Sequence, residues 1–275
     1  MTGRLDGKVA IVTGAGSVGP GWGNGRATAV IFAREGARVL AVDLDEKSLR
    51  DTVDMGAGIS PHLCDVTDSA AVAGMVAACQ AEFGRVDILV NNVGGTFQAP
   101  FLDIAEKGWD ALIRTNLKSV FHGVRAVAPR MIARGRGGSI INVVSIEGAR
   151  AAPLFGPYAA CKAAVINFTQ TTALELGGHG IRVNAIAPDI CLTEGLTALL
   201  PETEPTRYRH LVPLGRPAVP EDIAGAAVFL ASDLAGYVTG VTLFVDGGTH
   251  AAAGWYRDPE SGDWILGPPR GLQRP

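Results

Sequence analysis

Short, nearly continuous apolar runs recur along the chain and predict strands that are buried on both faces. They occupy residues 9–12, 39–42, 88–90, 140–144, 183–187 and 243–245. Such runs are typical of parallel sheets covered by helices, because a sheet with one solvated face shows alternation of apolar and polar residues instead. We therefore expect a parallel sheet at the centre of the molecule.

Helix-like segments fill the intervals between these runs. They span residues 26–35, 46–53, 69–83, 106–134, 158–176 and 221–231. Strands and helices that alternate at this spacing favour right-handed βαβ units. We predict an α/β fold, with about seven parallel strands in a doubly wound sheet flanked by helices, forming a single domain over residues 1–249.

Residues 250–275 are interpreted as a C-terminal tail. The aromatic-rich arms 255–257 and 263–266 flank a Pro/Gly-containing stretch, and this pattern predicts a short β-hairpin. Because an isolated hairpin is marginal in water, we expect its Trp and Ile side chains to pack on the same subunit's lid or on a neighbour. Residues 267–275 fit a disordered end better.

Composition narrows the function classes. The chain has 275 residues, 47% apolar and 19% charged, with a formal net charge of −3 and no basic run, which gives no support to nucleic-acid or membrane binding. It lacks an 18-residue apolar stretch and a signal-peptide core. The cysteines show neither Cys-x-x-Cys nor metal spacing, so we expect reduced thiols, a cytoplasmic protein and no metal. They are Cys64, Cys79, Cys161 and Cys191.

A glycine-rich segment follows the first predicted strand. A literal G-x-G-x-x-G occurs at Gly14, Gly16 and Gly19, but the residues after Gly19 are Pro and Gly, which cannot propagate a helix. The helical pattern begins only after Gly23. We therefore expect Gly23 and Gly25 to lie at the helix N-terminus.

An acidic residue supports this alignment of the glycines. Asp43 ends the second predicted strand, 18 residues after Gly25, near the spacing of about 20 at which a carboxylate meets the adenosine ribose. The loop should then cradle a pyrophosphate with its backbone amides and the helix dipole, in a Rossmann-type domain.

Tyr158 and Lys162 are four residues apart on a predicted helix, downstream of Asn116 and Ser145. This spacing puts an ammonium beside a phenol on one helix face. A free tyrosine is a poor base at neutral pH, whereas a neighbouring cation favours the phenolate. We expect Tyr158 to exchange a proton with a substrate.

Together these motifs resemble the short-chain dehydrogenase/reductase family over residues 5–248. The family's catalytic tetrad matches Asn116, Ser145, Tyr158 and Lys162. The resemblance implies that Tyr158 is the general acid/base and that Lys162 supports it while holding the nicotinamide ribose. It further implies that Ser145 donates to the reacting oxygen and that Asn116 supports a water relay to Lys162.

The resemblance also implies a nicotinamide dinucleotide, which we predict to be NAD. The family's Thr-Gly-x-x-x-Gly-x-Gly is present with residues 18–22 as an apparent insertion, which is either a cover for a ligand or a solvated bulge. Asp43 would repel a 2′-phosphate, and neither Ser17 nor Leu44 is basic. The expected NAD contacts are Gly14, Ser17, Gly23, Asn24, Gly25, Asp43, Leu44, Asp65, Val66, Asn92, Gly94, Tyr158, Lys162, Pro188, Cys191 and Thr193.

The predicted substrate contacts are Ser145, Glu147, Phe155 and Asp189. Asp189 is the clearest departure from the family, because it places a carboxylate where the family usually has glycine. The substrate segments we expect also include the 151–156 loop and the lid over residues 192–211. A small-molecule alcohol or ketone is the implied partner.

We predict an NAD(H)-dependent oxidoreductase that interconverts a secondary alcohol and a ketone. The alternatives are an NADP-dependent 3-oxoacyl reductase of the same family and a catalytically silent dinucleotide-binding regulator. An enoyl reductase of related fold is disfavoured, because that group spaces its Tyr and Lys more widely. The resemblance implies a homotetramer, assembled partly through the helices over residues 106–134 and 158–176.

Overall fold

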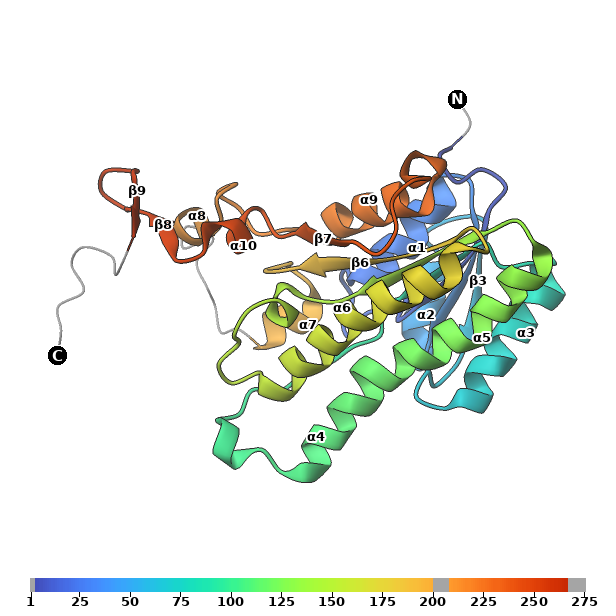
Figure 1. The fold of residues 1–275 in the computed structure, drawn as a ribbon, viewed down its shortest axis with the longest axis horizontal. Helices are drawn as coiled ribbons and strands as arrows, with labels where there is room; N and C mark the ends of the chain where they lie inside the picture. The colour runs from blue at the N-terminus through green and yellow to red at the C-terminus, as the bar shows by residue number, and fades with distance from the viewer. Residues whose placement is uncertain (1–2, 200–207, 267–275) are drawn as a thin grey trace.

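The computed structural model describes residues 3–199 and 208–266. Its centre is a parallel sheet of seven strands in the order β3-β2-β1-β4-β5-β6-β7 (Figure 1). This arrangement confirms the predicted doubly wound sheet in one domain. The strands are β1 (Val9–Thr13), β2 (Arg38–Asp43), β3 (Ile59–Leu63), β4 (Ile88–Asn91), β5 (Gly138–Val143), β6 (Ile181–Pro188) and β7 (Thr242–Val245).

The strand order reverses between β1 and β4. The chain runs outward from β1 through β2 to β3, then returns to β4 on the other side of β1 and continues to β7. In open parallel sheets, ligands bind beyond the carboxyl ends of the strands at such a switch point, because the connections there diverge to opposite faces.

Helices cover both faces of the sheet (Figure 1). The helices α1, α2 and α9 pack on one face, and α3, α5 and α6 pack on the other. The longer helices are α1 (Asn24–Arg34), α2 (Glu46–Val53), α3 (Ser69–Phe83), α4 (Glu106–Ile113), α5 (Ser119–Arg134), α6 (Gly156–Gly177) and α9 (Pro220–Ala231). Shorter helical segments are η1 (Phe101–Asp103), η3 (Ile146–Gly148), α7 (Glu194–Leu199), α8 (Tyr208–Leu211), η5 (Asp233–Ala235) and α10 (Thr249–Ala252).

Alternate residues of each central strand enter opposite hydrophobic cores. In β1, Val9 and Ile11 pack with α3, α5 and α6, whereas Ala10 and Val12 pack with α1 and α9. All four side chains are fully buried. Both faces therefore need apolar residues, which is why the strand appears in the sequence as a continuous run.

The strand β3 escaped the apolar-run criterion because it forms the edge of the sheet. Only Ile59 of this strand is buried, and the strand contains Pro61, which lacks a backbone donor. An edge strand tolerates proline where its N–H side faces no partner strand.

The segment 106–134 is not one continuous α-helix, and in this detail the prediction is wrong. A π-helical turn, η2 (Arg114–Lys118), separates α4 from α5. Such turns add a residue to the helical repeat and are frequent at functional sites. Here the turn carries Asn116, which is completely buried.

The aromatic arms after residue 254 pair as an antiparallel hairpin of β8 (Trp255–Arg257) and β9 (Trp264–Leu266). In Figure 1 the hairpin lies far from the seven-stranded sheet, and β8 contacts α8 of the lid. The Arg257 guanidinium lies 5.1 Å from the Trp264 ring centroid, and Trp255 and Trp264 remain partly exposed. The expectation for residues 267–275 falls outside the described residues.

Candidate active site

The glycine-rich loop connects the carboxyl end of β1 to α1. Gly14 adopts a φ of +64°, which favours glycine, and α1 begins at Asn24 with Gly23 as its N-cap. Gly23 and Gly25 are thus the glycines at the helix N-terminus. The literal motif that ends at Gly19 opens no helix.

Two of these glycines allow the helix to approach the strand closely. A Cβ added to Gly25 would lie 1.8 Å from the carbonyl oxygen of Gly14. The same oxygen accepts a hydrogen bond of 3.0 Å from the Asn92 side chain, which also donates to the Thr13 carbonyl. Asn92 therefore ties the end of β4 to the loop after β1, across the switch point.

A cavity of about 470 Å³ opens above this loop. Most of the predicted NAD contacts line it, namely Gly14, Ser17, Gly23, Asn24, Gly25, Asp43, Leu44, Asp65, Val66, Asn92, Gly94 and Thr193. Tyr158, Lys162, Pro188 and Cys191 do not. The lining residues that sequence reasoning missed are Gly16, Val18, Val42, Asp45, Cys64, Thr67, Val93, Thr115 and Gly195.

The lining of this cavity fits a dinucleotide. The hydroxyl oxygen of Ser17 is buried and has no hydrogen-bond partner among the described residues, so a ligand could supply one. Asp43 accepts hydrogen bonds from the backbone N–H groups of Gly16 and Leu44 at 2.9 and 2.7 Å. These bonds fix its carboxylate at the end of β2, where a ribose would meet it.

The 18–22 insertion is held in place by hydrogen bonds from the Arg26 side chain. This side chain is fully buried, and it donates to the carbonyl oxygens of Gly21 at 2.6 Å and Pro20 at 3.3 Å. It also donates to Ser48 and Thr52 of α2 at 3.0 Å. The insertion is therefore bound to the body of the domain through α1 and α2.

The insertion also contacts α7, which lies in the segment predicted to form a lid. A Cβ added to Gly19 or Gly21 would lie 2.7 or 2.0 Å from the carboxylate oxygens of Glu194, at the start of α7. A Cβ added to Gly195 would be in van der Waals contact with the Val18 side chain, at 3.7 Å. The insertion is thus a contact surface for α7 at the rim of the cavity.

The predicted catalytic residues meet beside the nicotinamide end of the predicted cofactor path. The Lys162 ammonium lies 5.5 Å from the Tyr158 ring centroid and donates to the Val143 carbonyl oxygen at 3.0 Å. Ser145, two residues after the end of β5, is hydrogen-bonded to Tyr158. A Cβ on Gly94, which lines the cavity, would lie 3.2 Å from Lys162 Nζ.

Asn116 holds the wall of the site from the π-helical turn. Its side-chain amide donates to the carbonyl oxygens of Gly95 at 2.9 Å and Leu112 at 3.1 Å, and its Oδ1 accepts from the Gly95 N–H. A Cβ on Gly94 would approach this Oδ1 to 2.9 Å. Two members of the predicted tetrad, Asn116 and Lys162, therefore lie against the 94–95 loop, and Tyr158 joins them through its contact with Lys162.

Burial decides the protonation of Tyr158 and Lys162. It raises the pKa of Tyr158 to about 12, although the hydrogen bond from Ser145 acts in the opposite direction. It lowers the pKa of Lys162 to about 8. The spacing predicts that Lys162 favours the phenolate, whereas desolvation by burial is the largest influence on the pKa of Tyr158 and favours the neutral phenol.

The predicted substrate residues follow β5 and β6. Glu147 lies in η3, and Asp189 directly follows β6. Arg150 joins them, with its Nη2 at 2.9 Å from Glu147 Oε1 and 3.4 Å from Asp189 Oδ1. Sequence reasoning did not single out Arg150. Phe155 is the N-cap residue of α6. It lines neither the cavity above the glycine-rich loop nor the larger cavity at the amino ends of β4, β5 and β6.

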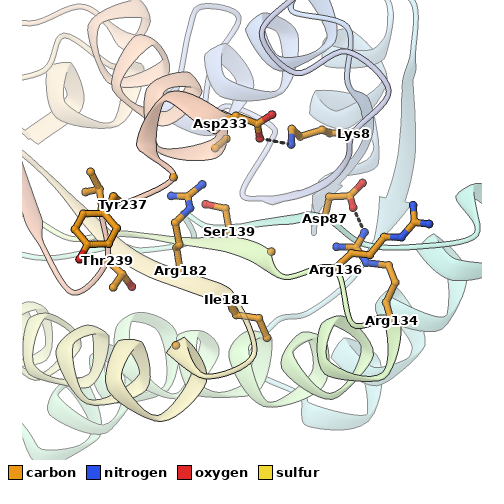
Figure 2. A pocket seen from close by; sticks show the side chains of 16 residues that line it. Lys8, Asp87, Arg134, Arg136, Ser139, Ile181, Arg182, Asp233, Tyr237 and Thr239 are labelled. Atoms are coloured by element: carbon orange, nitrogen blue, oxygen red, sulfur yellow. Dashed lines mark hydrogen bonds and ion pairs between the residues drawn. The ribbon is translucent and has the colours of Figure 1, made fainter.

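A larger cavity, of about 670 Å³, lies at the opposite edge of the sheet, where β4, β5 and β6 begin (Figure 2). Its walls carry ion pairs between Lys8 and Asp233, at 2.8 Å, and between Arg134 and Asp87. Ligands of open parallel sheets bind beyond the carboxyl ends of the strands, and the predicted site residues lie at those ends too. We therefore place the active site at the carboxyl ends of the strands.

Within residues 3–199 and 208–266, the four cysteines are buried and unpaired, and no three His, Cys, Asp or Glu side chains are grouped to hold a metal ion. No helix in the same ranges is long and apolar enough to cross a membrane.

Comparisons with known proteins identify the family of the chain. Residues 20–250 match the family profile described as enoyl-(acyl carrier protein) reductase. The chain is 43% identical to the 3-oxoacyl-[acyl-carrier-protein] reductase FabG of Thermotoga maritima, over 89% of this chain and 98% of the relative. It is 41% identical to the D-threitol dehydrogenase of Mycolicibacterium smegmatis, over 89% of this chain and 94% of the relative.

A solved structure shows the same fold. A Burkholderia xenovorans protein assigned to the short-chain dehydrogenase/reductases superposes with a TM-score of 0.85 and 44% identity, covering 90% of this chain and 98% of the other. The chain belongs to the short-chain dehydrogenase/reductase family, a class of oxidoreductases that act on CH–OH groups.

Proposed function

We propose that this protein is an NAD(H)-dependent dehydrogenase/reductase that interconverts a secondary alcohol and a ketone, with Tyr158 as the general acid/base. The observation that carries the proposal is the grouping of Ser145, Tyr158 and buried Lys162, in which the Lys162 ammonium lies 5.5 Å from the Tyr158 ring centroid and next to Gly94 of the cavity lining. A bound nicotinamide supplies or accepts the hydride.

The chain's own residues supply the proton transfer. With a pKa raised to about 12, Tyr158 is a phenol at neutral pH, ready to donate a proton to a forming alkoxide. Ser145 shares the hydrogen-bonding position next to it and stabilises the same oxygen. Lys162 holds its ammonium between the Val143 carbonyl and the tyrosine ring, where it stabilises a transient phenolate.

Asp43 supports a preference for NAD(H). Its carboxylate is fixed by backbone N–H groups at the end of β2, and the neighbouring Ser17 and Leu44 in the cavity lining carry no positive charge. A 2′-phosphate would meet a like charge without a compensating cation there. The four buried, unpaired cysteines support a reducing, cytoplasmic setting, and the helices α4, α5 and α6 remain the proposed contacts of a homotetramer.

An NADP-dependent 3-oxoacyl reductase is the second candidate. It is favoured by the similarity to 3-oxoacyl-[acyl-carrier-protein] reductases and opposed by Asp43. Similarity to the polyol dehydrogenases acting on D-threitol, sorbitol and galactitol favours the alcohol oxidation instead.

The test is a panel of alcohols and ketones followed by NADH and NADPH absorbance. We expect turnover that Tyr158→Phe lowers by a factor of about 10²–10⁴ or more, because phenylalanine keeps the ring and loses the proton. NADH binding, measured by fluorescence, should stay nearly unchanged in that variant. Substantial activity in Tyr158→Phe would refute the acid/base role, and intact cofactor binding without any turnover would favour a silent regulator.

A further inference from the structure

Charged side chains gather where β5, β6 and β7 end. These strands are neighbours in the sheet, with Val143 opposite Ile186 and Pro188 opposite Val245. Glu147 and Arg150 follow β5, Asp189 follows β6, and Asp246 follows β7. Because parallel strands bring their carboxyl ends to one edge, these four groups face the half of the edge that the dinucleotide cavity leaves free.

The contacts within this group are centred on Arg150. Its guanidinium bridges Glu147 and Asp189, at 2.9 and 3.4 Å. The Asp189 side chain is 10% exposed and that of Glu147 is 23% exposed, whereas Arg150 is 40% exposed. The carboxylates are thus largely withdrawn from water, and the guanidinium remains accessible.

The group has an excess of negative charge. Arg150 is its single cation among the described residues, and it faces Glu147, Asp189 and Asp246. Burial raises the pKa of Asp189, while Arg150 and a hydrogen bond from Thr249 act against that rise. The Asp246 oxygens are already engaged by the backbone N–H groups of Gly248 and His250. Glu147 and Asp189 are therefore the acceptors that a ligand would meet.

The group is directly connected to the proton-transfer residues. The Glu147 N–H donates to the Ser145 hydroxyl oxygen at 3.2 Å, and Ser145 is hydrogen-bonded to Tyr158. A substrate whose reacting oxygen lies between Ser145 and Tyr158 would extend its next carbons toward Glu147. These side chains lie where they can distinguish one alcohol from another.

We propose that Glu147, Arg150 and Asp189 select a neutral, hydroxyl-rich substrate, a polyol or its ketose, over unfunctionalised and anionic alcohols. This inference rests on the proposed function and names the substrate class of the same site. The substrate's additional hydroxyls donate to the two carboxylates and accept from the guanidinium, so every buried polar atom keeps a partner.

Apolar and anionic substrates are rejected for different reasons. An alcohol without further hydroxyls displaces water from the carboxylates and leaves them unpaired, which costs the desolvation free energy of those groups. Sites that hydrogen-bond a substrate hydroxyl discriminate strongly against analogues that lack it. An anion meets the excess negative charge of the group.

The test compares alcohols that all have a four-carbon chain: butan-2-ol, butane-2,3-diol, the tetritols erythritol and threitol, and 3-hydroxybutyrate as the anion. For the wild-type enzyme with NAD, we expect kcat/KM for the better tetritol to exceed that for butan-2-ol by about 100-fold or more. The kcat/KM for butane-2,3-diol should lie between these two values. The kcat/KM for 3-hydroxybutyrate should be lower than those for the diol and for the tetritols.

Two variants of Asp189 test whether its carboxylate causes the preference for tetritols over butan-2-ol. Asp189→Gly, which restores the residue usual in the family, should lower the tetritol to butan-2-ol ratio by about tenfold or more, mainly through a higher KM for the tetritol. Asp189→Asn, which keeps the shape of the side chain, should lower it less. Glu46→Gln is the matched control, because Glu46 forms an exposed ion pair with Arg50 on α2. It should leave every ratio unchanged.

The outcomes separate the two hypotheses. Turnover of butan-2-ol or 3-hydroxybutyrate as fast as that of the tetritols would overturn this inference and leave the oxidoreductase function standing. An unchanged ratio in folded Asp189→Gly and Asp189→Asn would also overturn it. Absence of turnover with all compounds, with both NAD and NADP, would overturn the proposed function and this inference with it.

Discussion

Gly25 at the start of α1 and Gly14 at the end of β1 are so close that a Cβ on Gly25 would lie 1.8 Å from the Gly14 carbonyl oxygen. Neither atom belongs to a flexible side chain, so Gly25→Ala must shift the helix or the loop. We expect this variant to lose at least about tenfold in NADH affinity, because the backbone amides that would face the pyrophosphate move with the helix. Fluorescence titration measures the loss.

Gly74 provides the matched control. It lies in α3, and a Cβ added there would meet no atom within 4 Å. Gly74→Ala should therefore bind NADH normally and gain up to about 1 kcal/mol of stability from helix propensity. Equal NADH affinity in the Gly25 and Gly74 variants would contradict the proposed cradle.

Substitution of Arg26 removes the hydrogen bonds that hold the 18–22 insertion. Arg26→Leu leaves the carbonyl oxygens of Pro20 and Gly21 without their side-chain donor, which should cost about 2–4 kcal/mol of unfolding free energy. The loosened insertion should also weaken NADH binding. Arg34→Leu changes an exposed arginine of the same helix and should do neither; denaturant unfolding and NADH titration of both variants decide.

Cofactor preference should depend on Asp43. We expect wild-type kcat/KM to favour NAD over NADP, and Asp43→Ala combined with Leu44→Arg to reduce that ratio by about 10–100-fold, since a like charge is removed and a cation added. Asp51→Asn removes an exposed carboxylate of α2 and serves as the control. A wild-type enzyme that favours NADP would refute the assigned role of Asp43.

We expect the buried Lys162 ammonium to lower the free energy of unfolding by an amount that depends on pH. Burial lowers its pKa from 10.5 to about 8, so between these values the unfolded chain binds more protons than the folded one, and wild-type stability rises with pH. Below pH 8 the full cost is present. Lys162→Met should then be inactive yet more stable than wild type at pH 7, by a difference on the order of 3 kcal/mol.

Denaturant unfolding of the cofactor-free proteins at several pH values measures this difference. It should shrink as pH rises from about 8 and reach a constant value above 10.5, where both states hold a neutral amine. A difference that does not change with pH would show that packing, rather than the buried charge, separates the two proteins.

Elements with local signals could be predicted closely. The helices α2 and α3 begin and end where the sequence pattern places them. Asp45 and Asp68 accept hydrogen bonds from backbone N–H groups at their N-termini, and Gly84 ends α3 with a φ of +81°. These boundaries depend on residues adjacent in the chain, which a sequence displays directly.

Features that depend on distant partners could not be predicted in the same way. Arg150 forms an ion pair with Glu147, three residues before it, and another with Asp189, 39 residues away, and nothing near Arg150 in the sequence indicates the second contact. The pKa of Tyr158 likewise depends mainly on its burial, which is set by the whole fold, whereas its spacing to Lys162 is local in the sequence. The order of the motifs along the chain was enough to predict the fold. The burial of individual side chains, which sets their pKa values, could not be predicted from that order.

The π-helical turn at residues 114–118 bears on how this chain should be compared with its relatives. It amounts to one additional residue accommodated within a helix, so removing a residue there would let the turn close into ordinary α-helix while α4 and α5 keep their positions. Asn116 would leave the wall formed with Gly95, although no side chain had been replaced. In evolutionary terms, a single-codon deletion in this turn could silence the enzyme while leaving every catalytic residue present in an alignment.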